Sequence, residues 1–140
     1  MKDTSNLLTY NQWTCGDYNG LNEFFNEAQL TNKYSNTGEY SIQAKRTSSR
    51  WWSDTILSLS STGKYTLSCK ILNKTGDVAV LRLLQDNASV TVAQVSIPVT
   101  DSFTSFSLTG TITNLNDCRI RLLNYGSDDL FIDYMVLTSS

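Results

Sequence analysis

The 140-residue sequence contains no histidine, one proline, three cysteines and seven glycines that are scattered singly along the chain. Histidine is the most common general base, so its absence excludes the usual Ser–His and Cys–His catalytic sites. Without histidine, and with cysteines far apart in the sequence, we expect no zinc site. None of the glycines belongs to a phosphate-binding loop. Asp128 and Asp129 lie in a predicted turn, where an acidic pair is ordinarily a solvated loop, so we expect no enzyme activity.

The chain also lacks an excess of basic residues and a long hydrophobic segment. Its formal net charge is −2 and its pI is about 4.9, whereas nucleic-acid binding depends on cations that neutralise phosphates. The apolar runs are only four or five residues long, and crossing a bilayer takes about 20. We therefore expect no nucleic-acid binding and no membrane insertion. Because no apolar segment follows Met1, we also expect no signal peptide at this end.

Serine, threonine and asparagine supply much of the polar composition, which disfavours helices. Short runs of alternating or β-branched residues recur about every ten residues, separated by turns that contain glycine, asparagine or aspartate. The ten predicted strands are residues 7–13, 24–30, 40–46, 55–60, 65–72, 78–85, 90–97, 103–113, 118–124 and 130–137. A short helix over residues 21–30 remains an alternative to the second of them.

Several of these runs place apolar and polar side chains on opposite faces. In residues 118–124, for example, Ile120 and Leu122 share one face, and Arg119 and Arg121 share the other. Such strands are typical of antiparallel sheets with one solvated face. We therefore predict a single domain over residues 1–140 with an all-β fold, an antiparallel β-sandwich (jelly roll) of about ten strands.

Two of the three cysteines, Cys69 and Cys118, fall on the apolar faces of their runs. The simpler interpretation is that both are small buried hydrophobic residues. A disulfide between them remains open, because the sequence does not show whether their strands are adjacent.

The adjacent tryptophans Trp51 and Trp52 are the strongest sign of binding. Consecutive strand residues point to opposite faces, so at most one of them enters the core of a straight strand. Either they close the end of the sandwich, or at least one offers its flat face to a sugar ring. Planar amide and guanidinium groups would then bind the sugar hydroxyls, although such a polar face is also ordinary solvated surface. These polar candidates are Arg46, Arg82, Gln85, Arg121 and Asn124.

Four segments resemble landmarks of the galactose-binding-like jelly rolls: NLL at residues 6–8 with Trp13 after it, GEYSI at 38–42, GKYTLS at 63–68 and LFID at 130–133. Many non-catalytic carbohydrate-binding modules of glycoside hydrolases have this fold. Arg46-Thr47 followed by Trp51 is similar to the Arg-Thr and Trp of xylan-binding modules attached to xylanases, where these residues line a cleft on the concave sheet. The resemblance therefore implies that Arg46 and Trp51 or Trp52 contact a ligand.

The same modules commonly hold a structural Ca²⁺ between an acidic residue of the first strand and the aspartate of the last strand. Asp133 fits the second position, and the resemblance implies it as a metal ligand. Trp13-Thr14 stands where the acidic partner is expected. Because Ca²⁺ takes six to eight oxygens, carbonyl groups, Asn11 or Gln12 would have to complete the site. The modules also use an acidic residue late in the penultimate strand, where this chain has Leu123-Asn124-Tyr125.

These observations predict non-catalytic binding of a polysaccharide or glycan, with xylan among the candidates. The domain would be secreted or at a cell surface, as part of a longer multidomain protein that it holds on a polysaccharide. One alternative is a structural or receptor-recognising domain of a phage tail or similar particle, located in the virion. A protein-binding adhesin domain is another, and it would show an exposed apolar patch.

Overall fold

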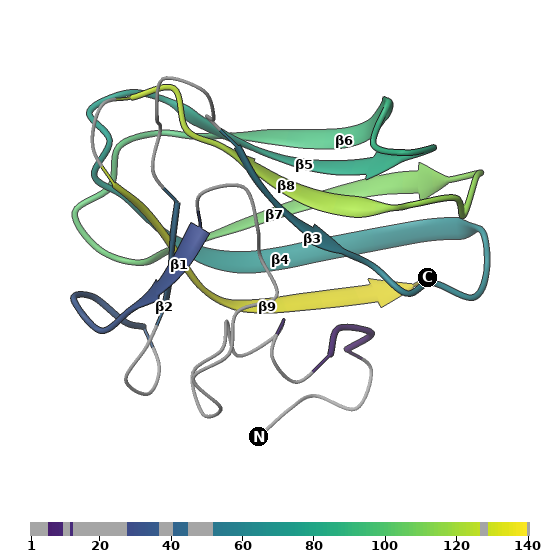
Figure 1. The fold of residues 1–140 in the computed structure, drawn as a ribbon, viewed down its shortest axis with the longest axis horizontal. Coiled ribbons are helices and arrows are strands. Elements are labelled where there is room, and N and C mark those ends of the chain that lie inside the picture. The colour runs from purple at the N-terminus through teal and green to yellow at the C-terminus, as the bar shows by residue number, and fades with distance from the viewer. Residues whose placement is uncertain are drawn as a thin grey trace.

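The computed structural model describes residues 6–9, 12, 28–36, 41–44, 52–126 and 129–139, and nine strands in them form two antiparallel sheets (Figure 1). The five-stranded sheet has the order β1 (Ala28–Thr31), β2 (Ser41–Ala44), β9 (Leu130–Ser139), β4 (Gly63–Asn73) and β7 (Thr104–Ile112). The four-stranded sheet has the order β3 (Trp52–Ile56), β8 (Arg119–Leu123), β5 (Ala79–Gln85) and β6 (Val90–Ile97). The predicted all-β sandwich is confirmed.

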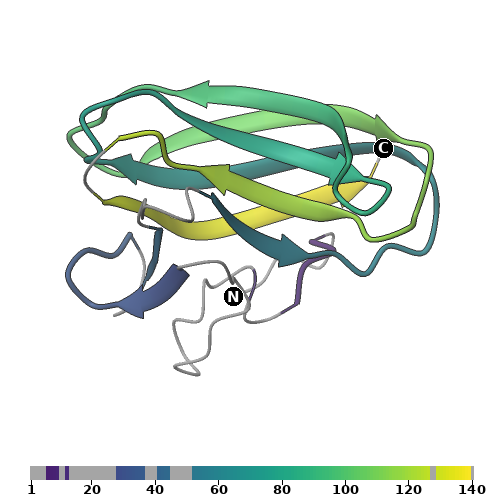
Figure 2. The same cartoon turned by 45° about the horizontal axis from the view of Figure 1, so that its top comes forward.

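The two sheets lie face to face as two layers, which the tilted view makes plain (Figure 2). The hydrophobic core lies between them, because the pleat of each strand turns alternate side chains inward. In β4 this alternation places Leu67, Cys69 and Ile71 in the core, while Ser68 and Lys70 stay half-exposed on the outer face. The four-stranded sheet contributes the fully buried residues Leu81, Leu83, Ile120 and Leu122.

The sandwich closes along one side, where the edge strands β6 and β7 of the two sheets run together (Figure 2). Gly110 in β7 lies at this contact. A Cβ atom on it would lie 2.8 Å from the Cβ of Ala93 and 2.9 Å from the carbonyl oxygen of Val92. Both distances are shorter than van der Waals contact, so glycine is what allows the two sheets to approach here.

The first predicted strand, residues 7–13, is wrong in the part that the structure describes. Leu7 and Leu8 have irregular backbone and Gln12 has helical backbone. The reason is a capping box: Thr9 Oγ1 accepts a hydrogen bond from the Gln12 N–H at 3.2 Å, and Gln12 Oε1 accepts one from the Thr9 N–H at 3.0 Å. Gln12 Nε2 then donates to the carbonyl of Ile56 at 2.6 Å, which ties this turn to β3.

Two other strand predictions needed adjustment. Strand β3 begins at Trp52, three residues before the predicted run of residues 55–60. Residues 28–31 form β1, so the helix alternative fails for that part, and the remainder of residues 21–30 lies outside the described residues. Within the described ranges, no helix has the length and apolar character needed to span a membrane.

Cys69 and Cys118 are buried and free, which excludes a disulfide between them. Burial raises the pKa of the Cys69 thiol to about 12. Both therefore act as small buried hydrophobic residues, as the apolar faces of their strands predict. Cys15 lies outside the described residues.

Candidate functional site

The outer face of the four-stranded sheet carries a continuous row of polar side chains that crosses all four strands. The strand registers pair Asp54 of β3 with Arg121 of β8, Arg121 with Arg82 of β5, and Arg82 with Gln94 of β6. We call these four residues the polar row. Residues paired in this way have Cβ atoms roughly 5 Å apart on the same face of the sheet. The sheet thus gathers groups that are up to 67 positions apart in sequence.

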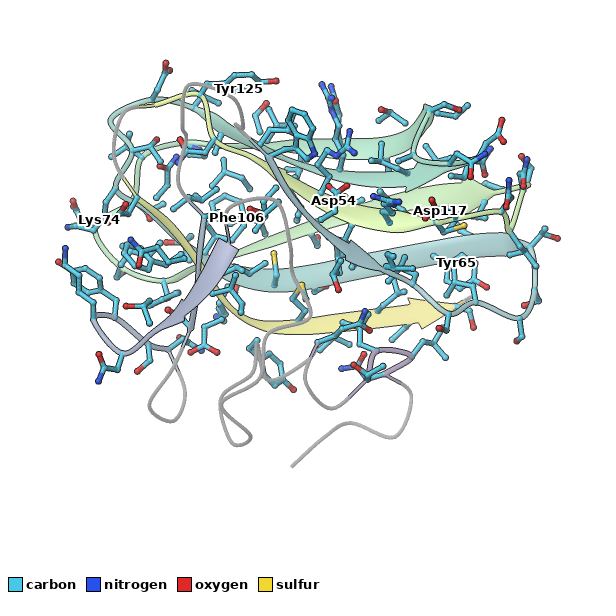
Figure 3. All side chains as sticks on the ribbon, in the orientation of Figure 1. Asp54, Tyr65, Lys74, Phe106, Asp117 and Tyr125 are labelled. Atoms are coloured by element: carbon cyan, nitrogen blue, oxygen red, sulfur yellow. The ribbon has the colours of Figure 1, made fainter. Side chains whose placement is uncertain are left out.

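Asp54 anchors one end of the polar row and is completely buried. Arg121 donates from Nε to Asp54 Oδ1 at 2.7 Å and from Nη2 to Oδ2 at 2.8 Å. Arg119 Nη1 donates to the same Oδ2 at 3.1 Å. Both carboxylate oxygens therefore accept hydrogen bonds from guanidinium groups, and the paired donors fix the plane of Arg121. Figure 3 shows Asp54 among the strands of this sheet.

Asp117 supplies a second carboxylate from the turn just before β8. Arg119 donates from Nε to Asp117 Oδ1 and from Nη2 to Asp117 Oδ2, both at 2.8 Å. These hydrogen bonds lower the pKa of Asp117 and, with those to Asp54, raise the pKa of Arg119. Arg119 is consequently held by two carboxylates.

Trp52 lies beside the polar row at the start of β3, the edge strand of the four-stranded sheet. Its position two residues before Asp54 places it on the same outer face. The Trp52 side chain is half-buried, and Arg121 Cζ lies over its ring, 5.3 Å from the centroid. This is within the range of a cation–π contact, so the indole and the guanidinium are held as one assembly.

The structure brings together three of the predicted site residues, namely Trp52, Arg82 and Arg121, and it gives two others structural roles. Gln85 is buried, and its Oε1 accepts hydrogen bonds from the backbone N–H groups of Thr113 and Asn114 at 2.8 and 3.2 Å. Asn124 is buried, and its Nδ2 donates to the carbonyl of Ala44 at 3.1 Å. Gln85 therefore fastens the turn after β7, and Asn124 fastens the end of β8 to β2. The remaining two ligand-contact predictions, Arg46 and Trp51, lie outside the described residues.

Asp133, the predicted calcium ligand, is fully buried in β9. Its Oδ2 accepts a hydrogen bond from the backbone N–H of Asn36 at 2.6 Å. In the described part of the chain, no three acidic, cysteine or histidine side chains gather to hold a metal ion. Asn11, Trp13 and Thr14 lie outside the described residues.

A second aromatic group lies away from the polar row. Tyr34 follows β1, and its ring meets the ring of Phe131 edge-on at 5.0 Å. The ammonium groups of Lys33 and Lys74 lie 5.7 and 5.3 Å from the Tyr34 centroid. Figure 3 shows Lys74 at the opposite end of the sandwich from Asp117.

Sequence reasoning placed Arg119 on the polar face with Arg121 but did not name Asp54, Gln94 or Arg119 as site residues. A signal for Asp54 was present, because strand alternation places it in phase with Trp52. The pairing of Asp54 with two arginines has no sequence signal, since it depends on which strand lies beside β3.

The chemistry available on this face is recognition. Guanidinium and amide groups present hydrogen-bond donors at fixed angles, and the indole presents a flat apolar surface. Both oxygens of the Asp54 carboxylate accept hydrogen bonds from arginines.

No family model and no curated protein matches this sequence, but many solved structures share its fold. The enzymatically active domain of tailspike protein 4 of bacteriophage CBA120 has a TM-score of 0.67 and 14% identity, covering 97% of this chain and 22% of the tailspike chain. TmCBM61, solved in complex with β-1,4-galactotriose, has a TM-score of 0.60 and 13% identity, covering 96% of this chain and 99% of its own.

The CBM22-1–GH10 modules of Clostridium thermocellum xylanase 10B, solved with xylohexaose, have a TM-score of 0.59 and 12% identity to this chain. The match covers 82% of this chain and 25% of the xylanase chain. At these identities the similarities show the fold alone. They confirm the predicted jelly roll, and they confirm its resemblance in fold to carbohydrate-binding modules, including one from a xylanase.

Proposed function

We propose that this chain is a non-catalytic carbohydrate-binding module whose site is the outer face of the four-stranded sheet. The observation that carries the proposal is the position of Trp52, a half-buried aromatic ring at the edge of the polar row. The axial C–H groups of a sugar ring match a flat aromatic surface, here the indole face turned away from Arg121, while guanidinium and amide groups bind its hydroxyls. Arg121, Arg82 and Gln94 supply those groups in register beside the ring.

The structural neighbours support this proposal. TmCBM61 was solved with a galactotriose and the xylanase modules with a xylohexaose, and this chain shares their fold. Xylan and β-1,4-galactan are therefore among the first glycans to test. A shallow polar site exchanges hydrogen bonds to water for similar bonds to sugar, so a weak affinity at a single site is expected.

Within this proposal the domain holds a larger protein on a polysaccharide and cleaves nothing itself. The match covers only 22% and 25% of the tailspike and xylanase chains, which supports a role as one part of a longer protein. Such a protein would work outside the cell or in a virion. Release of reducing sugar from polysaccharide by the purified domain would contradict the non-catalytic assignment.

A second candidate is a structural or receptor-recognising domain of a phage tail or similar particle. The observation that favours it is the match of nearly the whole chain to part of a phage tailspike. The two candidates differ in assembly, because a tail component is expected to form a stable trimer and a polysaccharide-binding module is expected to be a monomer. Sedimentation equilibrium of the purified domain distinguishes them.

We also propose a structural Ca²⁺ at Asp133, which lies in β9 of the other sheet. Gln12 is a poor candidate to complete it, since its Oε1 accepts the Thr9 N–H and its Nε2 is directed at Ile56 and Thr55. Carbonyl oxygens would have to provide most of the six to eight ligands. Thermal unfolding with and without EDTA tests it, since a bound structural Ca²⁺ raises the melting temperature.

The proposed function is tested by electrophoresis in gels that contain xylans, glucans, mannans, galactans or pectins. We expect one class of polysaccharide to retard the domain, and Trp52→Ala to abolish that retardation. Val99→Ala removes an exposed apolar side chain that is not part of the polar row, in the connection after β6, and it should migrate like the wild type. Thermal unfolding of each variant verifies that it is folded. No retardation by any polysaccharide contradicts the proposal.

A further inference from the structure

Two arginines face each other on the outer face of the four-stranded sheet. Arg82 of β5 is the direct register partner of Arg121 of β8. Like charges directly opposite each other on neighbouring strands destabilise a sheet. The three arginines of this face, Arg82, Arg119 and Arg121, have only two carboxylate partners in the described residues, Asp54 and Asp117. Counted over the described residues, this face therefore carries an excess of positive charge in a chain whose net charge is −2.

The unneutralised charge belongs to Arg82. Arg119 and Arg121 both bind carboxylates, whereas Arg82 Nε donates to the neutral amide Oε1 of Gln94 at 2.9 Å. Among the residues that the structure describes, no carboxylate pairs with Arg82, and no acceptor takes its Nη1 and Nη2 groups. Arg121 likewise uses Nε and Nη2 for Asp54, and no described residue accepts a hydrogen bond from its Nη1. Within the described part of the chain, neighbouring strands thus present three charged nitrogen donors without an acceptor.

We infer that Arg82 and Arg121 together bind the carboxylate of an acidic sugar, so that the glycan recognised contains uronic acid. This inference rests on the proposed function and names the class of its ligand. A guanidinium group binds a carboxylate through parallel N–H donors, and one such anion would offset the charge of the arginine pair. Asp54 and Gln94 already orient the two side chains, so little conformational entropy is lost on binding.

Trp52 completes the site for a sugar that carries the anion. Trp52 lies at the β3 end of the polar row, and Gln94 lies at the β6 end. Arg121 lies over the indole ring. A pyranose ring placed beside Trp52 therefore has its substituents next to the guanidinium groups. A neutral glycan would use the same indole but would leave the charge of Arg82 unpaired. An acidic glycan should therefore bind more tightly than a neutral one.

The experiment compares polysaccharides that differ only in the carboxyl group. Polygalacturonate, alginate and glucuronoxylan are each paired with their carboxyl-reduced forms, in which the acid has become an alcohol. We expect the domain to bind at least one acidic polymer about tenfold or more tightly than its reduced form, the range for loss of hydrogen bonds to a charged group. The preference should decrease as salt rises, since partly exposed charges are screened.

Two variants with the same change of net charge locate the effect. Arg82→Gln removes the charge from the site, and Lys64→Gln removes one from an exposed position of β4 in the other sheet. Arg82→Gln should lose the preference for the acidic form, and Lys64→Gln should retain it. Thermal unfolding checks that both are folded.

Three outcomes overturn the inference. Equal binding of acidic and reduced polymers would refute it and leave the proposed function standing. An equal decrease in Arg82→Gln and Lys64→Gln would show general attraction by net charge rather than a site. Failure to bind any polysaccharide, acidic or neutral, would overturn the proposed function together with the inference.

Discussion

Asp54 and Arg121 lie directly opposite each other on β3 and β8, and two hydrogen bonds of 2.7 and 2.8 Å join the carboxylate of one to the guanidinium of the other. Asp54 is fully buried, while the Arg121 and Arg119 side chains remain 20% and 22% exposed. One carboxylate therefore organises both arginines of β8 and, through Arg121, the position of Trp52.

Asp54→Asn should be destabilising, because it removes the charge that compensates two largely buried guanidinium groups. We expect the free energy of unfolding to fall by about 3 kcal/mol, the lower end of the range for breaking a buried ion pair, since the arginines keep some contact with water. Urea unfolding measures this. Asp101→Asn, an exposed position in the connection after β6, is the control and should change stability by less than about 0.5 kcal/mol. Equal stability of Asp54→Asn and wild type would contradict the role given to this pair.

Gly110→Ala tests the contact between the edge strands β6 and β7. The added methyl group would meet the backbone of Val92 and the side chain of Ala93, so the sheets must move apart. Overpacking of this kind costs about 1–3 kcal/mol. Ser107→Ala, on an exposed position of the same strand, should be nearly neutral in the same thermal unfolding measurement. A Gly110→Ala protein as stable as wild type would show that the two strands can separate without cost.

Thr9→Ala and Gln12→Ala test the capping box that replaces the predicted first strand. Gln12→Ala should lower the free energy of unfolding by about 1–3 kcal/mol, since it also removes the hydrogen bond that Gln12 donates to the buried hydroxyl of Thr55. The double variant should cost less than the sum of the two single variants, because both remove the same reciprocal hydrogen bonds. If chemical denaturation shows that the losses of the two single variants add up to the loss of the double variant, the capping box is contradicted.

The two buried thiols should be inert in the folded protein. In a Cys15→Ser background, Cys69 and Cys118 should react with Ellman's reagent only after unfolding, since burial raises the pKa of both thiols. Burial raises the pKa of Cys69 from 9.0 to about 12. The contribution of the buried neutral thiol to the free energy of unfolding is therefore complete below pH 9 and is lost as pH rises toward 12. Fast labelling at neutral pH without denaturant would refute their burial.

Most of the fold could be predicted from sequence because burial follows strand alternation closely. Residues 90–97 were predicted as a strand and form β6 with the same bounds, and residues 78–85 differ from β5 by one residue. The strand starting at Trp52 was predicted too late, because Ser53 and Asp54 are buried although they are polar. The first run failed because a T-x-x-Q capping box overrode its apolar pattern.

The candidate site was predicted only in part, and the reason is topological. Arg82 and Arg121 were identified from the polar faces of their runs, and the adjacency of β5 and β8 then brought them together. Gln85 and Asn124 carry the same kind of side chain, yet the structure uses both to bind backbone groups at strand ends. Sequence alternation gives the face of a residue but not whether a neighbouring loop has already satisfied its hydrogen bonds.

The central claim is tested most directly by an NMR titration of the ¹⁵N-labelled domain with an oligosaccharide from the polysaccharide that retards it most. The account predicts shifts of the Trp52 indole N–H and the Nε–H groups of Arg82 and Arg121, together with backbone amides of β5 and β8. Saturation with no change at these groups, or changes confined to the surface around Tyr34 and Lys74, would contradict it.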